Sequence, residues 1–173
     1  MTFSLTAIIR AFVAPDYRLR CPPNLWRDIV AGLERRGAGR HEAGVFLLGV
    51  DIAGKKEVRD VVFYDDLDPH AYDTGVCVLH GDAFARLWSI CREKGLTVVA
   101  DAHTHPGLAF QSQSDRTNPM VARKGHIAII IPNFARWPIE RTELGVYEYA
   151  GAHTWHDRSG RKASRFFYRG LWA

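Results

Sequence analysis

The stretch that decides the fold is Thr97–His105, TVVADAHTH, an apolar run that ends in two histidines. Such a run, followed by the chain-breaking Pro106 and Gly107, is typical of a buried strand that leads into a loop. Side chains two residues apart on a strand project to the same face, so His103 and His105 can bind one metal ion together. A His-x-His pair also occurs as ordinary surface or capping histidines, because histidine has many roles.

Two further apolar runs predict strands that accompany this one. Glu42–Ile52 (EAGVFLLGVDI) is nearly continuous in apolar residues, which is typical of a strand covered on both faces. His126–Pro132 (HIAIIIP) predicts a third apolar strand. Ala53–Lys56 has the chemistry of a turn, and we expect Glu57–Tyr64 to be the hairpin partner that follows it.

Two segments predict amphipathic helices. Pro23–Arg36 presents one apolar face at helical spacing, formed by Leu25, Trp26, Ile29, Val30 and Leu33. Gly81–Lys94 carries a similar stripe, formed by Phe84, Leu87, Trp88 and Cys91, and Gly95 ends it. Strands interleaved with two helices predict an α/β, or α+β layered, domain with a mixed sheet flanked by helices.

The other segments have weaker patterns. We expect a first strand at Ser4–Ala14, an acidic loop at Asp65–Asp73 and a loop at Asn133–Glu143. Leu144–Tyr149 and Arg165–Arg169 predict closing strands with a polar hairpin between them.

Length and composition indicate one domain that spans residues 1–173. The 173 residues are 47% hydrophobic and 24% charged, which is enough to bury a core without disulfides. No apolar run approaches the ~20 residues that cross a bilayer, so we expect no membrane association. Cys21, Cys77 and Cys91 stand at wide spacings without a Cys-x-x-Cys pair, which favours a reduced, cytoplasmic setting.

The basic residues raise nucleic acid as an alternative partner. The formal net charge of +4 is too mild to indicate nucleic-acid binding by itself. A C-terminal cluster interleaves basic and aromatic residues, namely Arg158, Arg161, Lys162, Arg165 and Arg169 with Trp155, Phe166, Phe167 and Tyr168. Because no nucleic-acid-binding motif accompanies the cluster, we favour a strand with an apolar inner face and solvated arginines.

Asp115 extends the histidine pair into a possible metal site. It follows His105 by ten residues, and the intervening Pro106 and Gly107 let the chain turn back. A short helix at Gln113–Asn118 would bring its carboxylate towards the histidines. Two histidines and an aspartate leave a fourth position open, which is the arrangement of a catalytic rather than a structural zinc site. Alone, Asp115 would be read as an acid that complements the dipole of that helix.

Ser112 and Glu42 are the candidate catalytic side chains. Ser112 suits the N-cap of the short helix, and it can also donate a hydrogen bond to an oxyanion. Glu42 opens a buried strand, where it forms either a salt bridge or a solvated strand end, or acts as a general base on water.

Together, these residues resemble the JAMM motif of the JAB/MPN metalloproteases: Glu42 followed by AGVFLLG, then HTHP, then Ser112-Gln-Ser-Asp115. The resemblance covers residues 42–132. It implies the MPN fold, a cytidine-deaminase-like mixed sheet flanked by helices. It also implies that His103, His105 and Asp115 hold Zn²⁺, that Glu42 activates water and that Ser112 stabilises the oxyanion. The loop between His105 and Ser112 is one residue shorter than is usual in the family.

The resemblance implies a substrate class as well. The family consists of zinc-dependent isopeptidases and related hydrolases, so we expect hydrolysis of the amide after the C-terminal tail of ubiquitin or a ubiquitin-like modifier. The stretch HTHPG, with the following Gln-Ser and Asn118-Pro119-Met120, resembles the bacterial members that accompany E1- and E2-like enzymes, some in antiphage defence. We expect Asp65–Val76 and Asn133–Glu143 to wall the tail, with Asp65, Asp66 and Asp68 binding its basic residues.

Two other functions compete with this one. The first is a non-catalytic MPN scaffold that only binds partners of a conjugation complex, although this chain keeps every position of the motif. The second is a zinc nucleobase deaminase, which would need a Pro-Cys-x-x-Cys ligand pair. The sequence contains no Cys-x-x-Cys, so we set the deaminase aside.

Overall fold

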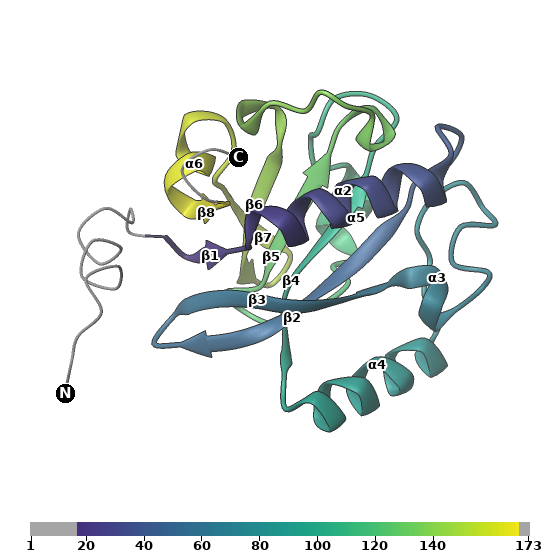
Figure 1. Ribbon diagram of the computed structural model, residues 1–173, viewed down its shortest axis with the longest axis horizontal. Helices are drawn as coiled ribbons and strands as arrows, with labels where there is room; N and C mark the ends of the chain where they lie inside the picture. The colour runs from purple at the N-terminus through teal and green to yellow at the C-terminus, as the bar shows by residue number, and fades with distance from the viewer. Residues whose placement is uncertain (1–16, 170–173) are drawn as a thin grey trace.

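A mixed eight-stranded sheet organises the part of the chain that the structure describes (Figure 1). The computed structural model describes residues 17–169, so the strand expected at Ser4–Ala14 lies outside the described residues. Across the sheet the strands follow the order β7-β6-β5-β4-β2-β3-β1-β8. Their bounds are β1 Leu19–Arg20, β2 Gly44–Ile52, β3 Lys55–Phe63, β4 Thr97–Thr104, β5 Ile127–Ile131, β6 Gly145–Gly151, β7 Thr154–Asp157 and β8 Phe167–Tyr168.

The three apolar runs form the centre of the sheet, as predicted. β4 pairs antiparallel with β2 and parallel with β5. In this register His103 lies opposite Gly44 of β2 and Ile130 of β5. Because β2 and β4 are antiparallel, the start of β2 meets the end of β4. Glu42, just before β2, therefore lies at the same edge of the sheet as His105, just after β4.

Helices cover both faces of the sheet, giving an α+β architecture. Along β2 the side chains alternate, so Val45 and Leu47 pack in one cluster with α2, while Phe46 and Leu48 pack in another with α4. In Figure 1, α2 crosses in front of the sheet and α4 runs along the bottom. The helices are α2 Pro23–Gly37, α3 Tyr64–Leu67, α4 Gly81–Lys94, α5 Gln113–Thr117 and α6 Ala163–Phe166, with short 3₁₀ turns η1 Asn133–Ala135, η2 Arg141–Glu143 and η3 Gly160–Lys162.

The two long helices match the predicted segments closely. α2 ends one residue later than expected, at Gly37, and α4 has the predicted bounds. The predicted stripe of α4 is wrong at Trp88, which is 39% exposed, while Leu87 and Cys91 are buried. Trp88 lies at the border of the stripe, where the helix surface turns from cluster to solvent.

The α4 side of the sheet is covered over β2 and over the start of β4, where Val98 packs in the cluster of α4, but a cavity lies over the end of β4 and over β5. Ala128 and Ile130 of β5 and His103 of β4 line a cavity there instead of packing under a helix. On the other face, Ile127, Ile129 and Ile131 pack in the cluster of α2. The fold thus leaves a hollow on one half of one sheet face, beside the histidine pair.

The acidic loop predicted at Asp65–Asp73 is wrong in its first part. Tyr64–Leu67 forms the helix α3, and the Tyr64 side chain is fully buried. Arg36 of α2 forms ion pairs with both Asp65, at 2.8 Å, and Asp66, at 3.2 Å. The negative run is therefore neutralised by a neighbouring helix that is distant in sequence.

The C-terminal prediction is also partly wrong. Arg165–Arg169 is not one strand, because α6 ends at Phe166 and only Phe167–Tyr168 forms β8. The expected polar hairpin contains β7, which pairs antiparallel with β6. Arg169 was expected in solvent but is 4% exposed, and its guanidinium lies over the rings of Trp26 and Phe167. Stacking on aromatic faces explains how this arginine is buried.

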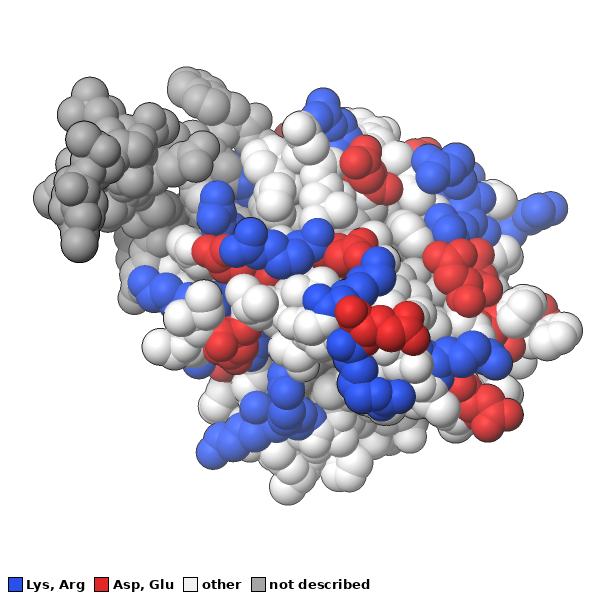
Figure 2. Space-filling model, turned by 60° about the horizontal axis from the view of Figure 1, so that its bottom comes forward, with Lys and Arg blue, Asp and Glu red and all other residues white. Residues whose placement is uncertain are grey.

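Charge on the visible surface is mixed. Figure 2 shows basic and acidic side chains interspersed over the face that turns the bottom of Figure 1 forward. In the described part of the chain, none of the helices has both the length and the apolar character needed to cross a bilayer.

Candidate metal centre

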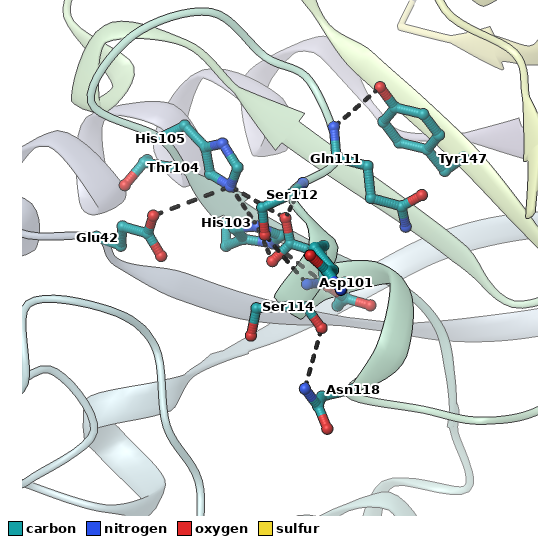
Figure 3. Close-up of polar contacts among 12 residues, drawn as sticks. Glu42, Asp101, His103, Thr104, His105, Gln111, Ser112, Ser114, Asn118 and Tyr147 are labelled. Atoms are coloured by element: carbon teal, nitrogen blue, oxygen red, sulfur yellow. Dashed lines mark hydrogen bonds and ion pairs between the residues drawn. The ribbon is translucent and has the colours of Figure 1, made fainter. Parts of the chain in front are cut away.

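His103 and His105 turn their rings towards one another at the end of β4 (Figure 3). Their Nε2 atoms are 3.1 Å apart, and both side chains are buried. The backbone of His105 continues the pairing with β5, since its N–H donates to the carbonyl of Ile131. Because side chains alternate along a strand, His103 and His105 project to the same face, as the sequence predicted.

Asp115 completes the group through the local chemistry of α5. Ser112 is the N-cap of this helix, and its hydroxyl accepts a hydrogen bond from the Asp115 N–H. The Asp115 carboxylate in turn accepts from the Ser112 N–H at 2.7 Å, which forms a capping box. This places one Asp115 oxygen 3.4 Å from His103 Nε2 and the other 3.4 Å from His105 Nε2.

The spacing of these three side chains fits one metal ion. Ligands at ~2.0–2.1 Å from a tetrahedral ion lie roughly 3.3–3.4 Å from one another. The observed separations between His103, His105 and Asp115 are 3.1 and 3.4 Å. Three nitrogen and oxygen ligands would leave the fourth position of such an ion open to the cavity.

The electrostatics of the group also favour a cation. Burial disfavours a charged Asp115, but hydrogen bonds from His103 and His105 outweigh it and hold the pKa of Asp115 well below its ordinary value. Burial likewise disfavours a charged His103, but Asp115, with help from the charges of Asp101 and Glu42, raises the pKa of His103. A site that keeps a carboxylate ionised and stabilises positive charge suits a metal ion.

Glu42 lies beside the histidines, just before the start of β2. Its Oε1 is 3.9 Å from His105 Nε2. Two hydrogen bonds between Ala43 and Thr104 tie the start of β2 to the end of β4 and so hold Glu42 in place. Burial raises the pKa of Glu42, although His103 and His105 oppose the shift. A carboxyl group with a raised pKa is better able to take and return a proton near neutral pH.

The short loop between His105 and Ser112 is anchored by β6. The Gln111 N–H donates to the Tyr147 hydroxyl at 3.1 Å. Gly145 lies directly against the carbonyl of Ala109, so a side chain at Gly145 would collide with the loop. These two contacts hold the short loop in place and so position Ser112.

A cavity of about 410 Å³ opens directly onto this group. Glu42, His103, Ser112 and Asp115 line one part of it. The rest is mostly apolar, with walls that include Val76, Val78, Phe84, Met120 and Trp155. Segments far apart in the sequence thus enclose a space beside the possible metal ligands.

The two segments expected to wall the substrate tail lie in different places in the structure. From Asp65–Val76 only Val76 is among the residues that line the cavity, and the acidic residues are absent from its lining. Residues of Asn133–Glu143 line a second pocket instead, with Gly39 and Pro106. Trp137 is the exposed aromatic of that pocket.

Sequence reasoning missed Asp101 and Tyr147. Asp101 is 2% exposed and lines the cavity beside His103. The signal was present, because Asp101, His103 and His105 follow the same two-residue period along the strand. Tyr147 gave no such signal, since its contact with Gln111 spans 36 residues.

Comparison with solved structures finds similar folds at low sequence identity. The solution structure of protein DSY2949 from Desulfitobacterium hafniense matches with a TM-score of 0.61 and 14% identity, covering 88% of this chain and 94% of that one. The solution structure of a protein from Salinibacter ruber matches with a TM-score of 0.50 and 20% identity, covering 80% and 87% of the two chains. At these identities the likeness concerns the fold alone.

Comparison with curated protein sequences is more specific. No protein-family model matches the chain. The chain is 31% identical over 137 residues to the probable metalloprotease y4jG of Sinorhizobium fredii, a match that covers 79% of this chain and 84% of the relative. The candidate metal group and this relative point the same way, and the chain belongs to the metalloprotease family that y4jG represents.

Proposed function

We propose that the chain is a zinc-dependent peptidase of the JAMM type, built on an MPN fold. The single observation that carries the proposal is the grouping of His103, His105 and Asp115 within one metal ion's reach. Glu42 adds a carboxylate 3.9 Å from His105 Nε2, on the margin of the same cavity. Two histidines and one carboxylate with an open fourth position are the ligand set of several zinc peptidases.

The residues of the chain then have distinct roles. When bound, the zinc ion supplies Lewis-acid chemistry, which makes water a better nucleophile at neutral pH and polarises a carbonyl. Glu42 accepts a proton from the attacking water and passes it to the leaving amine, a step worth ~10²–10⁴ in rate. Ser112 already accepts a hydrogen bond from the Asp115 N–H, so its own hydrogen is free to be donated to the oxygen that becomes negative.

The proposed substrate is the amide bond after the tail of ubiquitin or a ubiquitin-like modifier. This rests on the resemblance of Glu42, HTHP and Ser112–Asp115 to the JAMM motif. The cavity supports it, because an extended tail can reach Glu42, His103 and Asp115 along the apolar walls. We further propose a cytoplasmic role beside E1- and E2-like enzymes, with antiphage defence as one setting.

The test is cleavage of a ubiquitin-like protein that carries a C-terminal extension. Wild type should cleave the fusion, a chelator should stop it, and added zinc should restore it. Glu42→Gln should keep the metal and lose activity by ~10²–10⁴, because the amide cannot shuttle the proton. Glu93→Gln, on the exposed side of α4, is the matched control and should remain active.

Two outcomes would count against the proposal. Cleavage that persists in Glu42→Gln would remove the role of this carboxylate. Bound zinc without cleavage of any modifier fusion or isopeptide would favour the binding scaffold.

A further inference from the structure

A buried carboxylate lies directly behind the candidate metal ligands. Asp101 precedes His103 by two residues on β4, so both side chains project to the same face of the sheet. The Asp101 side chain is only 3% exposed. Figure 3 shows it beneath the histidine pair. Since an uncompensated buried charge is costly, its partners indicate what it does.

Three side chains face the Asp101 carboxylate. His126, just before β5, lies with Nε2 2.5 Å from Asp101 Oδ1. Tyr64 of α3 donates its hydroxyl hydrogen to Oδ2 at 3.4 Å. His103 Nδ1 lies 4.0 Å from the same Oδ2. The contacts with His126 and Tyr64 hold the carboxylate in place, and the contact with His103 joins it to the metal group.

The orientation of the His103 ring indicates what the contact with Asp101 does. The Nε2 atom of His103 faces His105 and Asp115. The opposite ring nitrogen, Nδ1, faces Asp101. A histidine that binds a metal through one ring nitrogen almost always directs the other to a carboxylate, a carbonyl or water, which fixes the ring and makes it a better ligand.

The surroundings of Asp101 suit a fixed support. Burial and the charge of Asp101 raise the pKa of Tyr64 well above its ordinary value, so the phenol remains a hydrogen-bond donor. His126 is fully buried, and within the described chain its Nδ1 has no hydrogen-bond partner. A buried imidazole with one unpaired nitrogen costs stability. Its retention beside Asp101 favours a role other than packing.

We propose that Asp101 is a positioning residue that orients His103 for metal binding, and that His126 and Tyr64 act through Asp101. This rests on the metal site of the proposed function. The competing explanation is a buried polar cluster that serves only the stability of the fold. Metal affinity separates the two, because a cluster that only stabilises the fold would change thermal stability and leave the affinity of the folded protein unchanged.

The experiment measures zinc affinity of the metal-free chain by competition with a chromogenic chelator, together with the visible absorption of the cobalt-loaded chain. Asp101→Asn keeps the shape of the side chain and removes its charge. We expect ~10–100-fold weaker zinc binding and a changed cobalt spectrum, because the His103 ring loses its support. Asp101→Leu should weaken binding at least as much, and Asp101→Asn carries the test if Asp101→Leu does not fold.

Two further variants test the direction of the effect. His126→Gln should weaken binding in the wild-type background and should add nothing in the Asp101→Asn background, because it acts through Asp101. Tyr149→Phe is the control, because Tyr149 is buried on β6 and its hydroxyl accepts a hydrogen bond from the His153 N–H, away from the metal group. Loss of this hydroxyl should lower the melting temperature and leave zinc affinity within about twofold.

The outcomes distinguish this inference from the proposed function. Zinc affinity and cobalt spectrum that stay unchanged in folded Asp101→Asn would overturn the inference while leaving the metal site intact. An additive effect of His126→Gln would overturn its action through Asp101. A wild-type chain that binds neither zinc nor cobalt would overturn both the inference and the metal site.

Discussion

Ser112 and Asp115 hold each other in place through two reciprocal hydrogen bonds. The Ser112 N–H donates to the Asp115 carboxylate at 2.7 Å, and the Asp115 N–H donates to the Ser112 hydroxyl at 3.1 Å. A capping box is a common way to begin a helix. Here it also aims the Asp115 carboxylate at His103 and His105, each at 3.4 Å. One local motif thus serves both the helix and the candidate metal centre.

Substitution of Ser112 should therefore lower both stability and activity, for two different reasons. Ser112→Ala removes the cap and should cost about 1 kcal/mol in the free energy of unfolding. If the hydroxyl also stabilises the oxyanion, kcat should fall by ~10²–10³. Ser112→Thr keeps a hydroxyl and is the control. Urea unfolding and peptidase kinetics measure the two effects, and full activity in Ser112→Ala would remove the catalytic role.

Tyr147 should matter to the site although it lies on β6. Its hydroxyl accepts a hydrogen bond from the Gln111 N–H, which precedes Ser112. Tyr147→Phe should release this part of the loop and lower kcat/KM by about fivefold, corresponding to loss of one hydrogen bond worth about 1 kcal/mol.

Tyr149→Phe is the matched control for Tyr147→Phe. Tyr149 lies two residues further along β6, and its hydroxyl accepts from the His153 N–H at 3.1 Å, away from the site. It should lose similar stability and keep its activity. Equal activity in the two variants would show that the loop does not depend on Tyr147.

The sequence predicted the elements whose apolar pattern reflects their burial. The three central strands and α4 belong to this class, because continuous apolar runs and one apolar stripe correspond directly to covered surfaces. The strand β7 was not predicted, because Thr154–Asp157 is polar and largely exposed. It is a strand because it pairs with β6. β8 has two residues and depends on pairing with β1, from the other end of the chain.

Charge reversal at Asp65 should act on stability. If Asp65, Asp66 and Asp68 bound a basic substrate tail, as the sequence led us to expect, charge reversal would weaken substrate binding. In the structure Asp65 pairs with Arg36, whose guanidinium also lies over the Phe63 ring. Asp65→Lys should therefore lower the free energy of unfolding by about 1 kcal/mol and leave KM unchanged. A rise in KM for a basic substrate with unchanged stability would instead support a role of Asp65 in substrate binding.

The cysteines should be unreactive in the folded chain. Burial raises the pKa of the Cys21 thiol to about 12, only partly opposed by Arg169. Burial and the nearby charge of Glu42 raise the pKa of Cys77 well above its ordinary value. Both therefore remain protonated at pH 8, and the thiolate is the reactive form.

Alkylation with iodoacetamide, followed for each cysteine by mass spectrometry, measures this reactivity. Cys21 and Cys77 should react at least ~100-fold more slowly in the native chain than in urea. Thiol reagents should consequently leave peptidase activity intact while chelators remove it. Rapid native alkylation of Cys77 with loss of activity would indicate a cysteine nucleophile.

The candidate site was predictable where it follows short sequence periods. His103 and His105 follow the two-residue period of a strand, and Ser112 and Asp115 follow the three-residue spacing of a capping box. Asp101 obeys the same strand period, but its role depends on His126, which is 25 residues away. Such a pairing is set by the parallel register of β4 and β5, which the sequence alone does not specify.

The most direct test of the account is the zinc content of the purified chain. Wild type should hold one equivalent of zinc by elemental analysis, and His103→Ala should hold none, because two remaining ligands bind zinc weakly. His70→Ala, at an exposed histidine paired with Asp73, is the control and should match wild type. Wild type without metal, or His103→Ala with a full equivalent, would contradict the assignment of His103, His105 and Asp115 as the metal centre.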